Sequence, residues 1–371
     1  MGRSLRQILR VFLVVFLVAS CTDRTNIVFS DDAAQVGTHY QTFVATLRKQ
    51  TEGGWFGGER SDTLAYMDLE VSVPPAHRQG RIRFAHSRAD AARDFVVARR
   101  TDYQTAGAFS DALRKALRQR RPGERGVMLY VHGYNNSFAD GVFRTTQLMH
   151  DFELPGVGVH FSWPSAAHPL GYAHDRDSVL YTRDGLEKFL TQISAAGPDR
   201  IILIGHSLGA MLVMETLRQI EIRQPGWANR HLGGVVLVSP DLDIEVFKQQ
   251  TARFKRLPQP FIIFVSDGDR ALQLSSAING DKQRLGLLAD EKLLGDLPVT
   301  VVDVSEFAAS SDDRHFTVGT SELLIQLLRR SDAVGYAFDR DAGGRTGLLP
   351  GTALTLQGAT KIILSPLLLQ N

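Results

Sequence analysis

The chain has 371 residues, of which 43% are hydrophobic and 22% are charged. These are ordinary values for a globular protein with a buried core, and they exclude a disordered or collagen-like chain. The 42 basic and 40 acidic residues nearly balance, so we expect no nucleic-acid partner. The single cysteine excludes an internal disulfide framework and a zinc site built from thiolates.

The N-terminus has the pattern of a bacterial export signal. Arginines precede the apolar run 11–19, and residues 1–20 contain no acidic side chain. The run is too short for a transmembrane helix, which needs roughly 20 apolar residues. Residues 17–21, Leu-Val-Ala-Ser-Cys, resemble the lipobox of bacterial lipoproteins. The pattern therefore predicts that residues 1–20 are a lipoprotein signal peptide.

The only cysteine, Cys21, lies where this resemblance places the lipidated residue. By the resemblance, Cys21 becomes the new N-terminus, and two or more acyl chains would hold the protein durably on a membrane surface. Thr22 stands where an aspartate would favour inner-membrane retention in many Gram-negative bacteria. The resemblance therefore favours the periplasmic face of the outer membrane. The alternative is an ordinary signal peptide, or an uncleaved anchor, with an incidental cysteine.

The rest of the chain divides into three parts. Residues 21–36 are polar and predict a tether after the lipidated cysteine. Residues 37–330 carry strand and helix signals without an internal linker, which predicts one domain. Residues 331–371 form a C-terminal tail that is rich in glycine and then apolar. We expect the tail to lie as a strap over the domain, with membrane contact as the alternative.

The first part of the domain has two strand signals and one helix signal. Residues 43–47 and 69–73 predict strands, and the glycine-rich, charged stretch 51–61 predicts a loop between them. Residues 108–120 have apolar side chains at helical spacing and end at the Arg-Pro-Gly of 121–123, which predicts a helix.

From residue 126 onward, strand and helix signals alternate. Residues 126–132 are almost continuously apolar, which is typical of a strand buried on both faces. The alternation predicts an α/β fold with a mainly parallel, doubly wound sheet in a three-layer sandwich. The other expected strands are 157–163, 200–204, 234–239, 260–265 and 299–304, and the expected helices are 140–152, 177–195, 207–220 and 318–329.

The strongest chemical signal is the G-x-S-x-G pattern at residues 205–209. It follows the predicted strand 200–204 and opens a predicted helix, which is the context of a nucleophile elbow. The glycines permit a tight turn, and Ser207 would stand at the helix N-terminus, where the helix dipole stabilises negative charge. The alternative is an ordinary strand–helix turn with an incidental serine.

A serine hydroxyl becomes a nucleophile when a base lies beside it and a carboxylate orients that base. In this strand–turn–helix context the chain order is serine, acid, histidine. Two histidines follow Ser207. His231 precedes a strand, whereas His315 follows the last predicted strand, so His315 is the expected base.

The acid has three candidates in the loops after two predicted strands. Asp267 and Asp269 follow the strand 260–265, and Asp241 follows the strand 234–239. We expect Asp269 to be the acid, with Asp267 and Asp241 as alternatives.

Two backbone N–H groups are expected to form an oxyanion hole. One belongs to Leu208, directly after the nucleophile, and the other belongs to Tyr134, in the loop that follows the strand 126–132. We find no histidine–carboxylate grouping with metal-ligand spacing, no glycine-rich phosphate loop and no dinucleotide fingerprint. The sequence therefore predicts neither a metal nor a cofactor.

Taken together, these motifs resemble those of the α/β-hydrolase superfamily. The chain is similar in particular to a bacterial group of the esterase/lipase type whose function is unknown. The resemblance implies that Ser207, Asp269 and His315 form a catalytic triad, but it implies no particular substrate. It covers roughly residues 42–328 and rests on residues 43–48, 71–74 with His77 and Gly80, 131–135, 161–165, Tyr172 with Asp175 and Arg176, 205–209, 239–241 and 269–272.

These observations predict a membrane-anchored serine hydrolase that cleaves a carboxylic ester through an acyl-serine intermediate. Its partners would be a small-molecule or lipid acyl ester and, through the lipid anchor, a membrane. One alternative is an acyltransferase or amidase that uses the same triad. The other is a non-catalytic binding or assembly lipoprotein that retains the fold.

Overall fold

The computed structural model describes residues 27–85, 88–280, 283–288, 290–330, 352–356 and 359–365. The expected signal peptide 1–20, the expected lipidation site Cys21 and most of the expected tail lie outside the described residues. Within these ranges, no helix is both long enough and apolar enough to cross a membrane.

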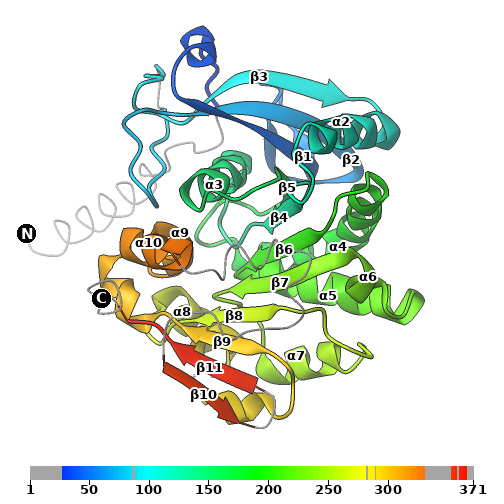
Figure 1. The fold of residues 1–371 in the computed structure, drawn as a ribbon, viewed down its shortest axis with the longest axis vertical. Coiled ribbons are helices and arrows are strands. Elements are labelled where there is room, and N and C mark those ends of the chain that lie inside the picture. The colour runs from blue at the N-terminus through cyan, green and yellow to red at the C-terminus, as the bar shows by residue number, and fades with distance from the viewer. Residues whose placement is uncertain are drawn as a thin grey trace, which may run out of the picture.

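The described strands form one eleven-stranded sheet in the order β10-β11-β9-β8-β7-β6-β4-β5-β1-β2-β3 (Figure 1). Neighbouring strands from β11 through to β1 are parallel, whereas β2, β3 and β10 pair in antiparallel fashion. The expected mainly parallel sheet is therefore confirmed. The strands are β1 Thr38–Gln50, β2 Phe56–Val73, β3 Val96–Tyr103, β4 Val127–Val131, β5 Val157–Ser162, β6 Ile201–His206, β7 Leu232–Val238, β8 Phe261–Val265, β9 Thr300–Asp303, β10 Thr352–Leu356 and β11 Ala359–Ile363.

Helices connect the parallel strands and lie on both faces of the sheet (Figure 1). The predicted helix 318–329 is interrupted at Ser321, which separates α9 from α10. The α-helices are α2 Ala106–Arg118, α3 Phe138–Asp151, α4 Tyr172–Ala195, α5 Leu208–Arg223, α6 Trp227–His231, α7 Ile244–Thr251, α8 Arg270–Asn279, α9 Thr317–Thr320 and α10 Glu322–Arg330. Short 3₁₀ helices are η1 Asp31–Ala34, η2 Leu285–Leu287, η3 Glu291–Leu294 and η4 Ser305–Ser310.

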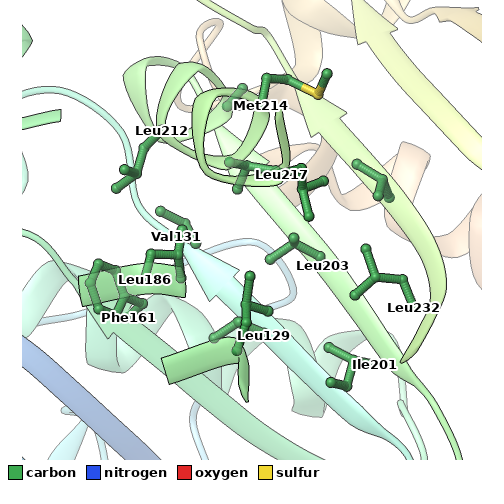
Figure 2. Packing of buried hydrophobic residues seen from close by; sticks show 14 of the residues in the cluster. Leu129, Val131, Phe161, Leu186, Ile201, Leu203, Leu212, Met214, Leu217 and Leu232 are labelled. Carbon is green, nitrogen blue, oxygen red and sulfur yellow. The ribbon is translucent and has the colours of Figure 1, made fainter. Parts of the chain in front are cut away.

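The central strand β4 shows why the sheet needs helices on both faces. Its side chains alternate, so that Leu129 and Val131 join a cluster with residues of α2, α4 and α5 (Figure 2). Met128 and Tyr130 point the other way and pack with residues of α3 and α10. Both sets are buried, which accounts for the unbroken apolar run in the sequence and confirms the three-layer sandwich.

The N-terminal part of the sheet departs from the sequence prediction. The loop expected over 51–61 is confined to 51–55, and β2 begins at Phe56. A Cβ on Gly58 would lie 3.0 Å from the backbone of Ser165, so this glycine marks a close approach between two segments rather than a loop. Strand β3, which pairs with β2, was not predicted from the sequence.

Both expected terminal segments contribute to the folded domain. Ile27 is buried and Phe29 stacks on Trp55 at 5.3 Å, so packing begins inside the stretch expected to be a tether. At the other end, β11 pairs in parallel with β9, and β10 pairs with β11. The residues expected to be a strap thus extend the sheet, because an unpaired edge on β9 would expose backbone N–H and C=O groups.

Replacing Leu203 of β6 tests this core. Leu203 is fully buried between β4, β7 and α5, so Leu203→Ala should lower the free energy of unfolding by about 2–5 kcal/mol. The matched control is Leu170→Ala, because Leu170 is 88% exposed; this change should stay within about 0.5 kcal/mol. Urea denaturation measures both, and equal losses in the two variants would contradict the placement of the core.

Candidate active site

The turn between β6 and α5 holds Ser207 in a strained conformation. Its φ of 53° lies in the left-handed region, which non-glycine residues seldom adopt. The backbone N–H of Ser207 donates to Val238 O at 3.0 Å, and its carbonyl accepts from the N–H of Ala210 at 3.0 Å and of Asp241 at 3.2 Å. These bonds to neighbouring segments hold the serine in its strained geometry.

The two glycines of the motif are required by contacts between backbones. A Cβ on Gly205 would lie 2.8 Å from the Cα of Ala210, inside the same turn. A Cβ on Gly209 would lie 2.3 Å from the carbonyl oxygen of His132 and 2.5 Å from that of Val131. Any larger residue would push α5 away from β4, so the turn can form only with glycine at both positions.

The loop that follows β4 lies directly over this turn. A Cβ on Gly133 would meet the Cβ of Ser207 at 2.9 Å. The backbone N–H groups of Tyr134 and Leu208 have no acceptor among the described residues. The Tyr134 hydroxyl donates to Pro169 O, so its side chain is engaged in a separate contact. Both expected donors therefore lie in segments that meet at Ser207, with their N–H groups available.

Asp269 and His315 form a pair in which the carboxylate is buried and the imidazole is partly exposed. The Nδ1 atom of His315 lies 2.8 Å from Oδ2 and 3.0 Å from Oδ1 of Asp269. Asp269 is fully buried and also caps α8, because its Oδ1 accepts the N–H of Leu272 at 3.0 Å. The pair joins the segments that follow β8 and β9, two strands that are consecutive in the chain and adjacent in the sheet.

The other acid candidates make different contacts. Asp241 accepts hydrogen bonds from the hydroxyls of Tyr172, at 2.9 Å, and Ser275, at 2.7 Å. Asp267 is exposed, and no contact joins its carboxylate to His315 among the described residues. Of the three carboxylates, Asp269 is therefore the one that can orient this imidazole.

His206 links the serine turn to the histidine segment. Its ring packs 4.8 Å from the ring of His315, and its Nε2 donates to the His315 carbonyl at 3.2 Å. Within the described part of the chain, no hydrogen bond joins the Ser207 hydroxyl directly to the His315 imidazole. Such bonds are often long before substrate binds. His206 stands in the G-x-S-x-G pattern itself, but the pattern predicts no function for the residue at this position.

A buried arginine, Arg48, supports the loop that carries Tyr134. Its guanidinium donates to the carbonyl of Asn136 at 2.7 Å and to that of Ser165 at 2.9 Å, and its Nη2 lies 3.3 Å from His132 Nε2. Burial lowers the pKa of Arg48 to about 10, which leaves it charged at neutral pH. The sequence signal for this residue is a charged side chain within a run of strand residues. We did not identify Arg48 as functional from that signal.

Asp175 also holds the loop that carries Tyr134. Its Oδ2 accepts from the Ser165 hydroxyl at 2.6 Å and from the Asn135 N–H at 3.2 Å, and its Oδ1 accepts from the Ala166 N–H at 2.7 Å. Asn135 has a φ of 55°, which asparagine tolerates better than most residues. The loop conformation is thus determined by buried charged groups.

Three side chains in the described residues have metal-ligand chemistry and lie close together. They are His77, His150 and Asp151, whose ligand atoms fall within 4.8 Å of one another. However, the oxygens of Asp151 already accept from His77 Nε2 at 2.6 Å and from the Gly80 N–H at 2.7 Å. Hydrogen bonds account for this cluster, and we assign no metal to it.

Comparison with known protein families identifies the chain. The model of a family described as "Alpha/beta hydrolase of unknown function (DUF900)" matches residues 105–331, which is more than half of the chain. The protein belongs to this family of α/β hydrolases. The match covers the strands and helices from α2 to α10, including the β6–α5 turn and the Asp269–His315 pair. The resemblance seen in the sequence motifs is thereby confirmed at the level of the superfamily.

Solved structures share only distant similarity with this hydrolase. Lipase B of Aspergillus fumigatus is 15% identical, with 65% of this chain and 60% of that chain covered and a TM-score of 0.38. A protein of Agrobacterium vitis S4 named as a hydrolase is 14% identical, with 76% of this chain and 96% of that chain covered and a TM-score of 0.32. A lipase/esterase of Lactobacillus plantarum is 16% identical, with 42% of this chain and 71% of that chain covered and a TM-score of 0.26. No curated protein matches the chain. At these scores the likenesses say nothing about substrate.

The two neighbouring histidines of the hydrolase, His315 and His206, have pKa values shifted in opposite directions. Burial lowers the pKa of His315, but the hydrogen bond and the negative charge of Asp269 outweigh this effect, so the net result is a raised pKa. Burial and the nearby charge of His315 hold the pKa of His206 well below its ordinary value. Of the two imidazoles, His315 is therefore the one that binds a proton more readily.

Removing the carboxylate tests this explanation. In Asp269→Asn, His315 loses the partner that stabilises its protonated form, so its pKa should fall below the wild-type value. The titration of the imidazole can be followed by NMR in the isotopically labelled protein. Asp267→Asn is the matched control, because Asp267 is exposed, and it should leave the His315 titration unchanged. An unchanged pKa in Asp269→Asn would contradict the assignment of the partner.

Proposed function

We propose that this hydrolase cleaves a carboxylic ester through an acyl-serine intermediate. The observation that carries the proposal is the partly buried Asp269–His315 pair, which packs through His206 against the strained turn of Ser207. A carboxylate, an imidazole and a serine, in the segments that follow β8, β9 and β6, are the groups that nucleophilic catalysis by serine requires. The serine is only 1% exposed, so reaction would take place away from bulk water.

In the first half of the reaction, His315 Nε2 accepts the proton of Ser207 Oγ while this oxygen attacks the carbonyl carbon of the ester. Asp269 holds the other ring nitrogen and stabilises the imidazolium that forms. The negative charge that develops on the carbonyl oxygen is stabilised by the N–H groups of Leu208 and Tyr134 and by the N-terminus of α5.

In the second half, the tetrahedral intermediate collapses, and the ester's alcohol leaves with the proton from His315. Water then attacks the acyl-serine while His315 accepts a proton from it. As this second intermediate collapses, the bond from carbon to Ser207 Oγ breaks, His315 returns its proton to Oγ, and the carboxylic acid is released. The chain's own residues supply each proton transfer in this scheme.

Covalent labelling tests the nucleophile. A fluorophosphonate probe should label the wild-type protein and should not label Ser207→Ala, because the attacking oxygen is missing. Hydrolysis of p-nitrophenyl esters should fall by at least about 10³-fold in Ser207→Ala and in His315→Ala. Ser276→Ala is the control, since Ser276 is buried on α8, has no hydrogen-bond partner in the part of the chain that the structure describes, and should keep full labelling.

Labelling that survives in Ser207→Ala would reject Ser207 as the nucleophile. The p-nitrophenyl ester assay also separates hydrolysis from acyl transfer. When an alcohol is added to the wild-type reaction, a transferase should form the new ester in preference to the free acid.

We also propose that Cys21 is lipidated and anchors the domain at the bacterial envelope, at the periplasmic face of the outer membrane. The support is the lipobox pattern of residues 17–21 and the position of the only cysteine within it. Five residues lie between Cys21 and Ile27, which is the first described residue and is buried, so six Cα–Cα steps join the two. Even fully extended, they span roughly 20 Å, which would keep the domain close to the lipid surface.

Replacing the cysteine tests the anchor. Cys21→Ser lacks the thiol that would carry the acyl chain, so the protein should move from the membrane fraction to the soluble fraction and lose incorporation of labelled palmitate. Ser207→Ala serves as the control, because it should remain in the membrane fraction. A Cys21→Ser protein that still sediments with membranes would reject the proposal.

A further inference from the structure

The connection between β2 and β3 carries a basic cavity that the ester chemistry does not use. The cavity has a volume of about 310 Å³. This is large enough for a small ligand such as a phosphorylated glycerol or sugar. Arg78, Arg81, Arg83 and Arg93 line it, together with the side chain of His77. Four guanidinium groups around one small cavity call for an anionic ligand.

Part of this positive charge is uncompensated. The Nε of Arg81 lies 2.9 Å from Asp312 Oδ2, and the Nε of Arg83 lies 2.8 Å from Asp94 Oδ1. Arg78 and Arg93 are exposed and have no acidic partner among the described residues. These two arginines therefore remain available for a ligand.

A histidine with a buried side chain, His77, also lines the cavity. The side chain of His77 is 6% exposed, and its Nε2 lies 2.6 Å from Oδ1 of the fully buried Asp151. Asp151 is itself held by the Gly80 N–H, at 2.7 Å from its Oδ2. Nε2 is therefore engaged by Asp151, whereas Nδ1 makes no hydrogen bond among the described residues. The imidazole is thus held in a defined orientation at the cavity wall.

The connection is folded so that its two limbs contribute to the same cavity. Arg78, Arg81 and Arg83 come from the first limb, and Arg93 comes from the second. The N–H of Ala76 donates to the carbonyl of Ala92 at 3.2 Å, and that of Phe95 donates to the carbonyl of Arg83 at 2.9 Å. These bonds hold the limbs together before any ligand binds, which lowers the entropic cost of binding.

We propose that this cavity binds the phosphoryl group of a small phosphate ester. The planar fork of a guanidinium matches two oxygens of a phosphate, and several arginines around one anion are typical of phosphate recognition. Phe95 and Pro74 supply an apolar part of the wall, against which the organic portion of the ligand would pack. The site is built from residues that take no part in the ester chemistry, so it does not rest on the proposed function.

Calorimetric titration of the full-length protein tests the site. Inorganic phosphate and glycerol 3-phosphate are titrated at physiological ionic strength, and both should bind saturably. The double variant Arg78→Gln/Arg93→Gln removes the two unpaired guanidiniums and should weaken binding by about tenfold or more. The control is Arg253→Gln/Arg256→Gln, which removes the same charge from two exposed arginines that do not line the cavity and should bind as the wild type does.

Vesicle flotation distinguishes a soluble ligand from a lipid headgroup. In the Cys21→Ser background, vesicles of phosphatidylcholine are compared with vesicles that also contain phosphatidic acid, whose headgroup is a phosphate monoester. Binding that requires phosphatidic acid, Arg78 and Arg93 would identify a lipid as the source of the phosphoryl group. Binding of the soluble probes alone would identify a soluble ester.

Two results would overturn the proposal. One is the absence of saturable binding with the soluble probes together with no preference for phosphatidic acid. The other is binding that Arg78→Gln/Arg93→Gln leaves unchanged, or that the control pair weakens equally. In the latter case the interaction would be a general effect of surface charge. Loss of labelling by the fluorophosphonate probe has no bearing on this outcome, so the two proposals can fail separately.

Discussion

The structure depends on one close approach, that of the β6–α5 turn to the end of β4. Gly209 lies against the carbonyls of Val131 and His132, and Gly133 lies against Ser207. The Gly209 contacts are made between backbones, which cannot move aside, and the Gly133 contacts leave no space for a side chain beside Ser207 and His206. As a result, the strained serine and the loop that carries Tyr134 are held against each other by the sheet itself. The geometry proposed for attack and for oxyanion stabilisation follows from this packing.

The loop beside the serine is held by buried charge, which is costly unless every polar group is satisfied. Arg48 donates to several backbone carbonyls, and Asp175 accepts from backbone N–H groups of the same loops. His132, deep in this network, is kept neutral because burial and the neighbouring Arg48 lower its pKa well below the ordinary value. Its ring stacks on Trp163 at 4.7 Å and supports the loop. A rigid loop of this kind suits a site in which two N–H groups must be positioned before the reaction.

The near balance of charge over the whole chain conceals a strong local concentration. The basic cavity draws its arginines from a single connection between antiparallel strands, and its acidic neighbours neutralise only two of them. One of those neighbours, Asp312, belongs to the segment that carries His315. The cavity and the candidate active site are therefore structurally adjacent through the Arg81–Asp312 pair, although they are built from different residues and serve different chemistry in our proposals.

Local patterns were sufficient for the features that depend on neighbouring residues. The continuous apolar run of β4, the alternation of strand and helix, and the strand–glycine–helix context of Ser207 are all properties of short segments, and each could be identified from the chain alone. Contacts between distant segments could not be identified from the chain alone. That Asp269 rather than Asp241 or Asp267 meets His315, that β3 and β11 complete the sheet, and that Arg48 reaches the loop of Tyr134 became known from the fold. In each case the decisive contact joins residues whose separation along the chain carries no periodic signal, because packing of the whole sheet sets the distance between them.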